Sequence, residues 1–166
     1  RRPGSKERSL TRMPKTSAGI LMYRRIGDSI EIFLIHPGGP FWAKKDAGAW
    51  SIPKGEINPD EDPLAAARRE FSEETGSEIE GDFISLASIR QKGGKIVSAW
   101  AVEGSIDANA IRSNTFSMEW PPRSGRQAEF PEVDRAGWFN LADAREKLIP
   151  AQVPFIDELC SRLALA

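Results

Sequence analysis

Three glutamates near the middle of the chain have a spacing that suits chemistry at a metal ion. Glu73 and Glu74 follow Glu70 by three and four residues, and on an α-helix this places all three carboxylates on one side. Like charges so close repel one another, so the helix either leaves them in solvent or gathers a cation. Hard cations such as Mg²⁺ take oxygen ligands and keep water or substrate phosphates for the rest. The spacing therefore predicts an exposed acidic face or a divalent-metal site.

The residues around these glutamates predict the helix that would hold them. Asp62 can cap the free N–H groups, and Pro63 is tolerated at the first helical position. Gly76 stands where a left-handed cap would end the helix. We expect the helix to run from about Pro63 to Thr75. Its predicted buried stripe is Leu64, Ala67 and Phe71.

Segments rich in β-branched and aromatic residues predict strands on both sides of this helix. Residues 17–25 and 30–36 form either a hairpin or two successive strands joined by a turn. Residues 83–91 and 95–103 are the clearer hairpin, and residues 134–139 are the last strand.

The remaining segments predict two long loops and two C-terminal helices. Gly and Pro mark residues 37–49 as a loop. Residues 104–131 are loop-rich, with one short strand at 115–120, and a connection of this length is more often functional than idle. Helices are expected over residues 141–148, capped by Asn140, and from Pro150 to about residue 163.

Composition describes an ordinary globular chain. Its 166 residues suit one domain, and a formal net charge of −1 gives no overall attraction to nucleic acid or membrane. The single cysteine, Cys160, excludes an intramolecular disulfide and fits a reducing compartment, where it more often packs than reacts. We find no apolar run of membrane-spanning length and no signal-peptide pattern. These features predict a cytoplasmic protein.

The loop over residues 37–49 carries side chains suited to a nucleotide. Phe41 and Trp42 lie beside Lys44 and Lys45, and aromatics next to lysines suit a planar base stacked near phosphates. The alternative is that both aromatics pack on the core while the lysines stay in water. His36, the only histidine, ends a predicted strand just before this loop. A catalytic histidine is one interpretation, and a loop-edge histidine without a nucleophile partner is the preferred one.

The acidic stretch resembles the signature motif of the Nudix hydrolase family, the Nudix box. The box has a glycine, five residues, a glutamate, seven residues, Arg-Glu, an apolar residue, any residue, Glu-Glu, any residue and a glycine. The matching residues here are Gly55, Glu61, Arg69, Glu70, Phe71, Glu73, Glu74 and Gly76. Ser77 departs from the apolar residue that closes the box, and we expect this to cost only a little stability.

The resemblance implies a fold, a chemistry and a set of site residues. The implied fold is an α/β/α sandwich with a mixed central sheet over residues 16–166. The implied activity is metal-dependent hydrolysis of a nucleoside diphosphate linked to a second group. By position, the Gly55 carbonyl and the carboxylates of Glu70, Glu73 and Glu74 would bind Mg²⁺ or Mn²⁺. Arg69 would orient the carboxylates. Glu61 would order the loop or the outer shell of the metal.

The general base differs within the family, so several glutamates stay open for that role. Glu70 and Glu73 are two candidates, and a glutamate outside the box is the third. Glu132, six residues before Trp138, is similar in position to a glutamate that helps bind metal or water in diadenosine tetraphosphate hydrolases. Glu129 is a nearby rival.

Lysines around the box are expected to face the substrate phosphates. Lys54 is favoured because it adjoins Gly55, and Lys92 and Lys95 lie on the predicted hairpin. Lys44 and Lys45 complete the set. The alternative for each lysine is an ordinary solvated position.

Narrower similarity suggests the substrate. The sequence Trp50-Ser51-Ile52-Pro53-Lys54-Gly55 resembles the W-x-x-P-K-G segment that leads into the box of dinucleoside polyphosphate and diphosphoinositol polyphosphate hydrolases. The whole chain also resembles a bacterial Nudix subgroup of predicted phosphohydrolases. A dinucleoside polyphosphate such as diadenosine tetraphosphate is the first expectation. Nucleoside triphosphates, nucleotide sugars and diphosphoinositol polyphosphates are the alternatives.

Two other expectations concern class and partners. A nucleotide-sensing module without activity is the competing class, and the three retained glutamates argue against it. Residues 1–15 are expected to form a flexible basic tail, and Met13-Pro14 suggests a start site preceded by residues from a vector or an upstream start. Nucleic acid is not the expected partner of this tail. We expect a small nucleotide-type substrate and a monomer or homodimer.

Overall fold

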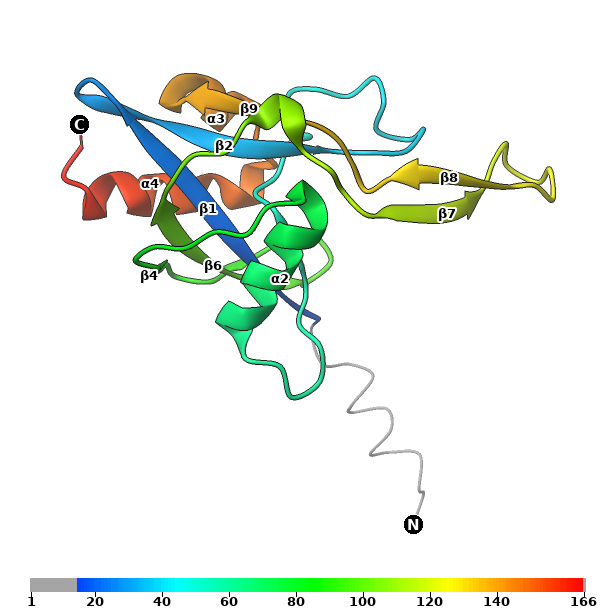
Figure 1. The fold of residues 1–166 in the computed structure, drawn as a ribbon, viewed down its shortest axis with the longest axis horizontal. Coiled ribbons are helices and arrows are strands. Elements are labelled where there is room, and N and C mark those ends of the chain that lie inside the picture. Colours follow the sequence, from blue (N-terminus) through cyan, green and yellow to red (C-terminus); the bar gives the residue numbers. More distant parts are fainter. Residues whose placement is uncertain (1–14, 166) are drawn as a thin grey trace, which may run out of the picture.

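A mixed β-sheet carries most of the chain, and helices cover both of its faces (Figure 1). The structure is a computed structural model that describes residues 15–165. The expected basic tail lies outside the described residues except for Lys15. The layered arrangement confirms the α/β/α sandwich expected from the sequence.

The two longest strands form the predicted N-terminal hairpin. β1 (Thr16–Ile26) and β2 (Ser29–Pro37) pair antiparallel around a two-residue turn. β1 also pairs in parallel with β6 (Ile96–Glu103) over eight residue pairs, and this pairing makes the sheet mixed. On the other side of β2, the last strand β9 (Val133–Asn140) pairs antiparallel. The strand order is therefore β4-β6-β1-β2-β9.

Three short strands complete the seven-stranded sheet. β3 (Lys54–Glu56) pairs with the start of β1 and leads into the central helix. β4 (Ile84–Ser85) and β5 (Ile89–Arg90) both pair with β6, so the strand expected over residues 83–91 is split in two. The split occurs where the backbone N–H of Ala87 leaves the sheet and donates to the Glu158 carboxylate at 2.7 Å.

Residues 104–131 differ most from the expectation. A short 3₁₀ turn, η1 (Ala108–Ala110), precedes a separate two-stranded ribbon made of β7 (Thr115–Glu119) and β8 (Gln127–Pro131). Figure 1 shows this ribbon extending away from the sheet. The sequence indicated the first strand and missed the second, whose alternating pattern of exposed and half-buried residues is only five residues long.

Two helices agree with the prediction within one residue, and the helix expected from Pro150 begins three residues later, after a 3₁₀ turn. α2 runs from Pro63 to Thr75 with Asp62 as its cap. α3 (Leu141–Lys147) begins at its predicted cap, Asn140, and α4 (Val153–Arg162) follows the 3₁₀ turn η2 (Pro150–Gln152). Within the described residues, no helix is both long and apolar enough to cross a membrane.

Two apolar cores hold these layers together, one on each side of the sheet. Phe71 of α2 packs with Phe33 of β2 in one core. Phe155 and Leu159 of α4 pack with the residues of the other core, and Cys160 is buried beside them. The thiol therefore packs, as its place in the apolar pattern predicted. The buried face of α2 packs entirely within the first core. Functional side chains of α2 must therefore lie on the neighbouring edge of the helix.

Candidate active site

The acidic edge of α2 lies beside its buried stripe, so the glutamates are held by a rigid element. Ala67 and Phe71 are fully buried against the sheet. The Asp62 carboxylate accepts from the N–H of Ala65 at 3.0 Å and fixes the start of the helix. Gly76 ends it in the left-handed conformation, with φ of 77°. A residue with a Cβ is disfavoured there on conformation alone.

Arg69 binds three carboxylates and one carbonyl at the same time. Its guanidinium donates to both oxygens of Glu61 at 2.8 and 3.0 Å. One terminal nitrogen donates to Glu70 at 2.9 Å and to Glu73 at 2.7 Å. The other also donates to the Glu56 carbonyl at 3.0 Å. A planar fork of fixed donors can make this set of bonds, and a lysine ammonium cannot.

The pKa values of Glu61 and Arg69 reflect the hydrogen bonds between them. Hydrogen bonds from Arg69 lower the pKa of Glu61 to about 2, and the backbone N–H of Asn58 adds to the effect. The same bonds raise the pKa of Arg69. Both groups are therefore charged at neutral pH, and the pair ties the loop after β3 to α2.

Gly55 allows the box loop to lie directly against the helix. A Cβ at position 55 would overlap the Glu70 carboxylate. No residue but glycine fits this approach without displacing the carboxylate. The backbone of Gly55 and the side chain of Glu70 are thus neighbours, as the motif spacing predicts.

Among the three glutamates of α2, Glu74 has the pKa that is shifted most from its ordinary value. It accepts from the backbone N–H of Lys54 at 3.0 Å. Burial raises its pKa to about 8, and the nearby charges of Glu70 and Glu132 also raise it. The hydrogen bond from Lys54 acts in the opposite direction and lowers it. Burial also lowers the pKa of Lys54, and the neighbouring Lys95 adds to this. A cation at this place would favour the ionised form of Glu74.

Glu132 lies close to the helix although it is far away in sequence. Its carbonyl accepts from the N–H of Gly38 at 2.9 Å. Burial raises the pKa of its carboxyl group, and the negative charge of Glu73 raises it further. The rival, Glu129, lies exposed on β8 and accepts from the Thr115 hydroxyl at 2.8 Å. The structure therefore brings Glu132, and not Glu129, to the carboxylates of α2.

The backbone of Asn114 links these two parts of the site. Its N–H donates to the carbonyl of Glu73, and its carbonyl accepts from the N–H of Glu132, both at 2.8 Å. The sequence carried no indication of this residue, because both contacts are made by main-chain atoms.

A cleft of about 190 Å³ joins the box to the loop after β2. Trp42, Lys54, Glu74 and Glu132 are the sequence-predicted residues that line it. Apolar side chains from β2 and from the segment before β3, including Ile35 and Ile52, form its other walls. The cleft therefore combines two carboxyl groups, the Lys54 ammonium and the Trp42 ring.

Of the predicted substrate residues, Trp42 and Lys54 line this cleft, and the others do not. Phe41 and Trp42 are 60% and 38% exposed, so the alternative that they pack on the core is wrong. The Lys45 ammonium lies 4.8 Å from the centroid of the Trp42 ring. Lys44 and Lys92 are exposed, and the structure does not bring either of them to the cleft wall.

One aromatic residue near this loop is not among those predicted from the sequence. Trp120, at the end of β7, contacts Phe41 edge to face, with ring centroids 5.5 Å apart. The only indication in the sequence was an aromatic residue directly before a Pro-Pro turn. This contact joins the ribbon to the loop that carries Trp42.

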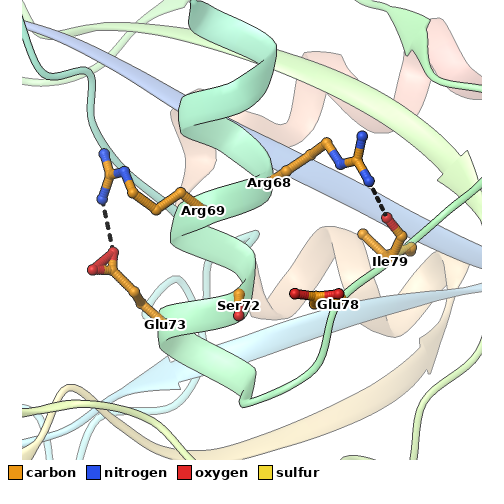
Figure 2. A pocket seen from close by; sticks show the side chains of 6 residues that line it. All are labelled: Arg68, Arg69, Ser72, Glu73, Glu78 and Ile79. Carbon is orange, nitrogen blue, oxygen red and sulfur yellow. Dashed lines mark hydrogen bonds and ion pairs between the residues drawn. The ribbon is translucent and has the colours of Figure 1, made fainter. Parts of the chain in front are cut away.

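A second hollow of about 340 Å³ lies on the outer side of α2 and is shown in Figure 2. Figure 2 shows Arg69 and Glu73 pointing toward each other on one side of the helix, and Arg68 reaching the Ile79 carbonyl on the other. Arg68 also pairs with Glu80. Glu73 lines this hollow, but Lys54, Glu74 and Glu132 line the smaller cleft instead, so we place the site there.

The side chains present fit a hard divalent cation. In residues 15–165, no three His, Cys, Asp or Glu side chains already converge on one centre. The reason is that Glu70 and Glu73 bond to Arg69, and Glu74 bonds to a backbone N–H. Each bond uses one carboxylate oxygen, and the second oxygen of each has no hydrogen bond within the described part of the chain. Free carboxylate oxygens beside the Gly55 backbone are the donors that Mg²⁺ and Mn²⁺ prefer.

Comparison with known proteins agrees with this geometry. The sequence profile of the NUDIX domain matches residues 13–159. No curated protein matches the chain in sequence.

Solved structures of the same fold are numerous. An Ap4A hydrolase from C. elegans, in a binary complex, superposes with a TM-score of 0.62 at 22% identity, covering 89% of this chain and 98% of that one. The NUDIX domain of Shewanella oneidensis NrtR, complexed with ADP ribose, gives 0.63 at 15% identity, covering 96% and 99%. A structure from work on MutT of Aliivibrio salmonicida and Vibrio cholerae gives 0.54 at 18% identity, covering 89% and 96%. Identities this low establish the shared fold.

Proposed function

Because the chain belongs to the NUDIX domain family of pyrophosphohydrolases, we propose that it hydrolyses a phosphoanhydride bond in a dinucleoside polyphosphate with the help of Mg²⁺ or Mn²⁺. The observation that carries this proposal is the cleft in which Glu74, Glu132, Lys54 and Trp42 meet. The carboxylates suit the metal, the lysine suits the substrate phosphates, and the tryptophan ring suits a base.

The metal would be held by the Gly55 carbonyl and by the carboxylates of Glu70, Glu73 and Glu74. Once bound, such an ion neutralises phosphate charge and makes water a stronger nucleophile at neutral pH. The role of Arg69 is to hold Glu70 and Glu73 on the same edge of α2. Glu61 keeps Arg69 in place by its two hydrogen bonds.

We assign the proton-accepting role to Glu132. It lines the cleft, and it lies outside the group of carboxylates that Arg69 holds. A base must be able to reach the attacking water. Glu70 and Glu73 are the alternatives, but each already accepts a hydrogen bond from Arg69.

Substrate binding would use both charge and stacking. Lys54, with Lys95 near it, would neutralise the phosphate chain. Trp42 lines the cleft with part of its ring exposed, so it offers a face for a base. Phe41 lies beyond it and would contact the second nucleoside of a dinucleotide substrate.

A nucleotide sugar is the second candidate, and one observation favours it. The NUDIX domain of NrtR that superposes on this chain was solved with ADP ribose. Both candidates share the adenosine diphosphate part, so the cleft itself does not separate them. Nucleoside triphosphates and diphosphoinositol polyphosphates remain further alternatives.

A substrate panel separates these candidates. Diadenosine tetraphosphate, ADP-ribose, ATP and a diphosphoinositol polyphosphate are each incubated with enzyme and Mg²⁺, and the products are identified by chromatography. We expect the highest kcat/KM for diadenosine tetraphosphate and no turnover when EDTA replaces the metal. A tenfold preference for another compound would overturn the substrate assignment. Turnover of none would favour a nucleotide-sensing module.

We also propose a cytoplasmic protein that acts as a monomer or homodimer on a small nucleotide-type molecule. A single buried cysteine supports a reducing compartment. Light scattering at several protein concentrations would give the oligomeric state.

A further inference from the structure

The only histidine of the chain lies buried next to the cleft. His36 is the penultimate residue of β2, and its side chain is fully buried. Its ring meets Trp50 edge to face, with ring centroids 5.1 Å apart. The sequence suggested a loop-edge histidine, but the ring is enclosed between the sheet and the loop that follows.

Each ring nitrogen of His36 contacts an oxygen from a different segment. Nδ1 lies 2.8 Å from a carboxylate oxygen of Asp134 in β9. Nε2 lies 2.6 Å from the backbone carbonyl of Lys45 in the loop after β2. The ring thus connects two segments that are 89 residues apart in sequence (134 − 45).

Both oxygens act as acceptors, which decides the protonation of the ring. A carbonyl oxygen has no proton to give, and an ionised carboxylate has none either. Neutral imidazole carries one N–H, so it can satisfy only one of the two contacts. The second oxygen of Asp134 lies 3.5 Å from the Arg135 guanidinium, so that oxygen has a partner of its own.

Two other charged groups lie near the ring, and each has partners of its own. On β9, Arg135 lies 3.5 Å from Asp134 and over the Trp50 ring at 5.3 Å. On the loop, Asp46 accepts from the Trp50 indole N–H and pairs with Lys147. The ring of His36 therefore has a carboxylate oxygen on one side and a carbonyl oxygen on the other.

The two segments that His36 joins each carry a residue of the proposed site. Lys45 holds its ammonium over Trp42, and its N–H donates to the Trp42 carbonyl at 2.9 Å. Asp134 follows Glu132 by two residues. Trp42 and Glu132 line the same cleft.

From this geometry we propose that His36 is a positioning residue, held as an imidazolium that donates to both Lys45 and Asp134 and so fixes Trp42 relative to Glu132. Residues 41–47 are all exposed and gain little from packing, so the loop is held mainly by individual contacts such as that of His36 with the Lys45 carbonyl. The effect on substrate binding rests on the proposed function, whereas the protonation state and the anchoring do not.

The protonation state can be measured on the unmodified chain. Because the chain has a single histidine, long-range ¹H–¹⁵N correlation spectra of tag-free protein report on this ring alone. We expect both ring nitrogens to be protonated at neutral pH, with protons that exchange slowly. One protonated nitrogen and one bare nitrogen would overturn the proposal, since one contact would then lack its proton.

Two variants separate anchoring from charge. His36→Phe keeps a buried ring but removes both donors. Asp134→Asn is the matched control, because a neutral ring can donate to Lys45 through Nε2 while accepting from the Asn amide at Nδ1. We expect faster hydrogen exchange of the Lys45 amide in His36→Phe only. Equal exchange in all three proteins would contradict the anchoring role, and His36→Gln replaces His36→Phe if the latter does not fold.

Kinetics then test the link to the site. With the substrate that the panel identifies, His36→Phe should raise KM about tenfold while kcat changes by less than about threefold, because Trp42 contributes to binding. Asp134→Asn should stay near the wild type in both. A loss confined to kcat, or no change in KM, would overturn the positioning role. If no substrate is found, the proposed function fails, while the spectra and hydrogen exchange still decide the protonation and anchoring of His36.

Discussion

At the scale of single residues, Arg69 organises the acidic edge of α2, and its geometry makes it hard to replace. Arg69→Lys keeps the charge but loses the fork that reaches Glu61, Glu70 and Glu73 together. We expect kcat to fall by about 10- to 100-fold, as when groups that orient metal ligands are lost. Arg68→Lys is the matched control, because Arg68 faces the other side of the helix and reaches the Ile79 carbonyl. An equal fall in both variants would contradict the special role of Arg69.

The pair of Glu61 with Arg69 also predicts a dependence of stability on pH. The folded pKa of Glu61 is about 2, below its ordinary value of 4.5. A lowered carboxylate pKa stabilises the folded state above the unfolded pKa, and the contribution disappears as pH falls through the folded value. Glu61→Gln should therefore unfold at lower urea concentration than the wild type at pH 7, and the difference should shrink between pH 4.5 and 2. A difference that is constant over this range would contradict the ion pair.

Residue-scale features differ in how well the sequence predicted them. The Nudix box predicted that Gly55 and Glu70 would be neighbours, because a motif at fixed spacing encodes a fixed backbone. It could not predict that His36 is buried with two partners. One of those partners is a carbonyl, which has no signature in sequence, and the other lies on a distant strand.

At the scale of elements, α2 was predictable because its start, stripe and end are all encoded locally. Asp62 and Gly76 bound a run of helix-favouring residues, and the structure places the helix between them. Strand β8 was not predictable in this way. Its register partners all lie on β7, and a five-residue alternation alone resembles a polar loop.

The end of α2 offers a stability test at this scale. Gly76 has φ of 77°, and a Cβ there would lie 2.8 Å from the Arg112 carbonyl oxygen. Gly76→Ala therefore meets both strain and a clash, and we expect a loss of about 1–3 kcal/mol in the free energy of unfolding. Gly27→Ala is the matched control, since its φ is 57° with nothing within 4 Å of the added Cβ. Equal losses in the two variants would show that the contact with Arg112 has no effect.

At the scale of the whole molecule, the site exists because distant segments meet at one corner of the sheet. The cleft joins the loop after β2, the segment before β3, α2 and the start of β9. Antiparallel pairing of β1 with β3 and of β2 with β9 brings these segments together. Local patterns predict strands but not which strands pair, so the sheet order and the meeting of Trp42 with Glu132 could not be derived from them. The family resemblance supplied the fold class that local patterns left open.

This assembly also predicts that the metal stabilises the whole fold. Burial raises the pKa values of Glu70, Glu74 and Glu132, and the charges of neighbouring glutamates raise them further, so the metal-free protein carries repulsion that a divalent cation would relieve. A ligand that binds only the folded state at 100 times its Kd adds about 2.7 kcal/mol. For a chain of this size we expect Mg²⁺ or Mn²⁺ to raise Tm by roughly 5–10 °C.

Glu74→Gln tests whether this stabilisation comes from the proposed site. The amide is neutral, so the variant should match or exceed the wild type in Tm without metal and show little further rise when metal is added. Activity should fall by about 10²-fold or more, since a group that holds the metal is lost. Glu78→Gln is the matched control, because Glu78 faces the outer hollow on the other side of α2. If metal still stabilises Glu74→Gln, the cation binds elsewhere, because this variant lacks the carboxylate that is proposed to hold it.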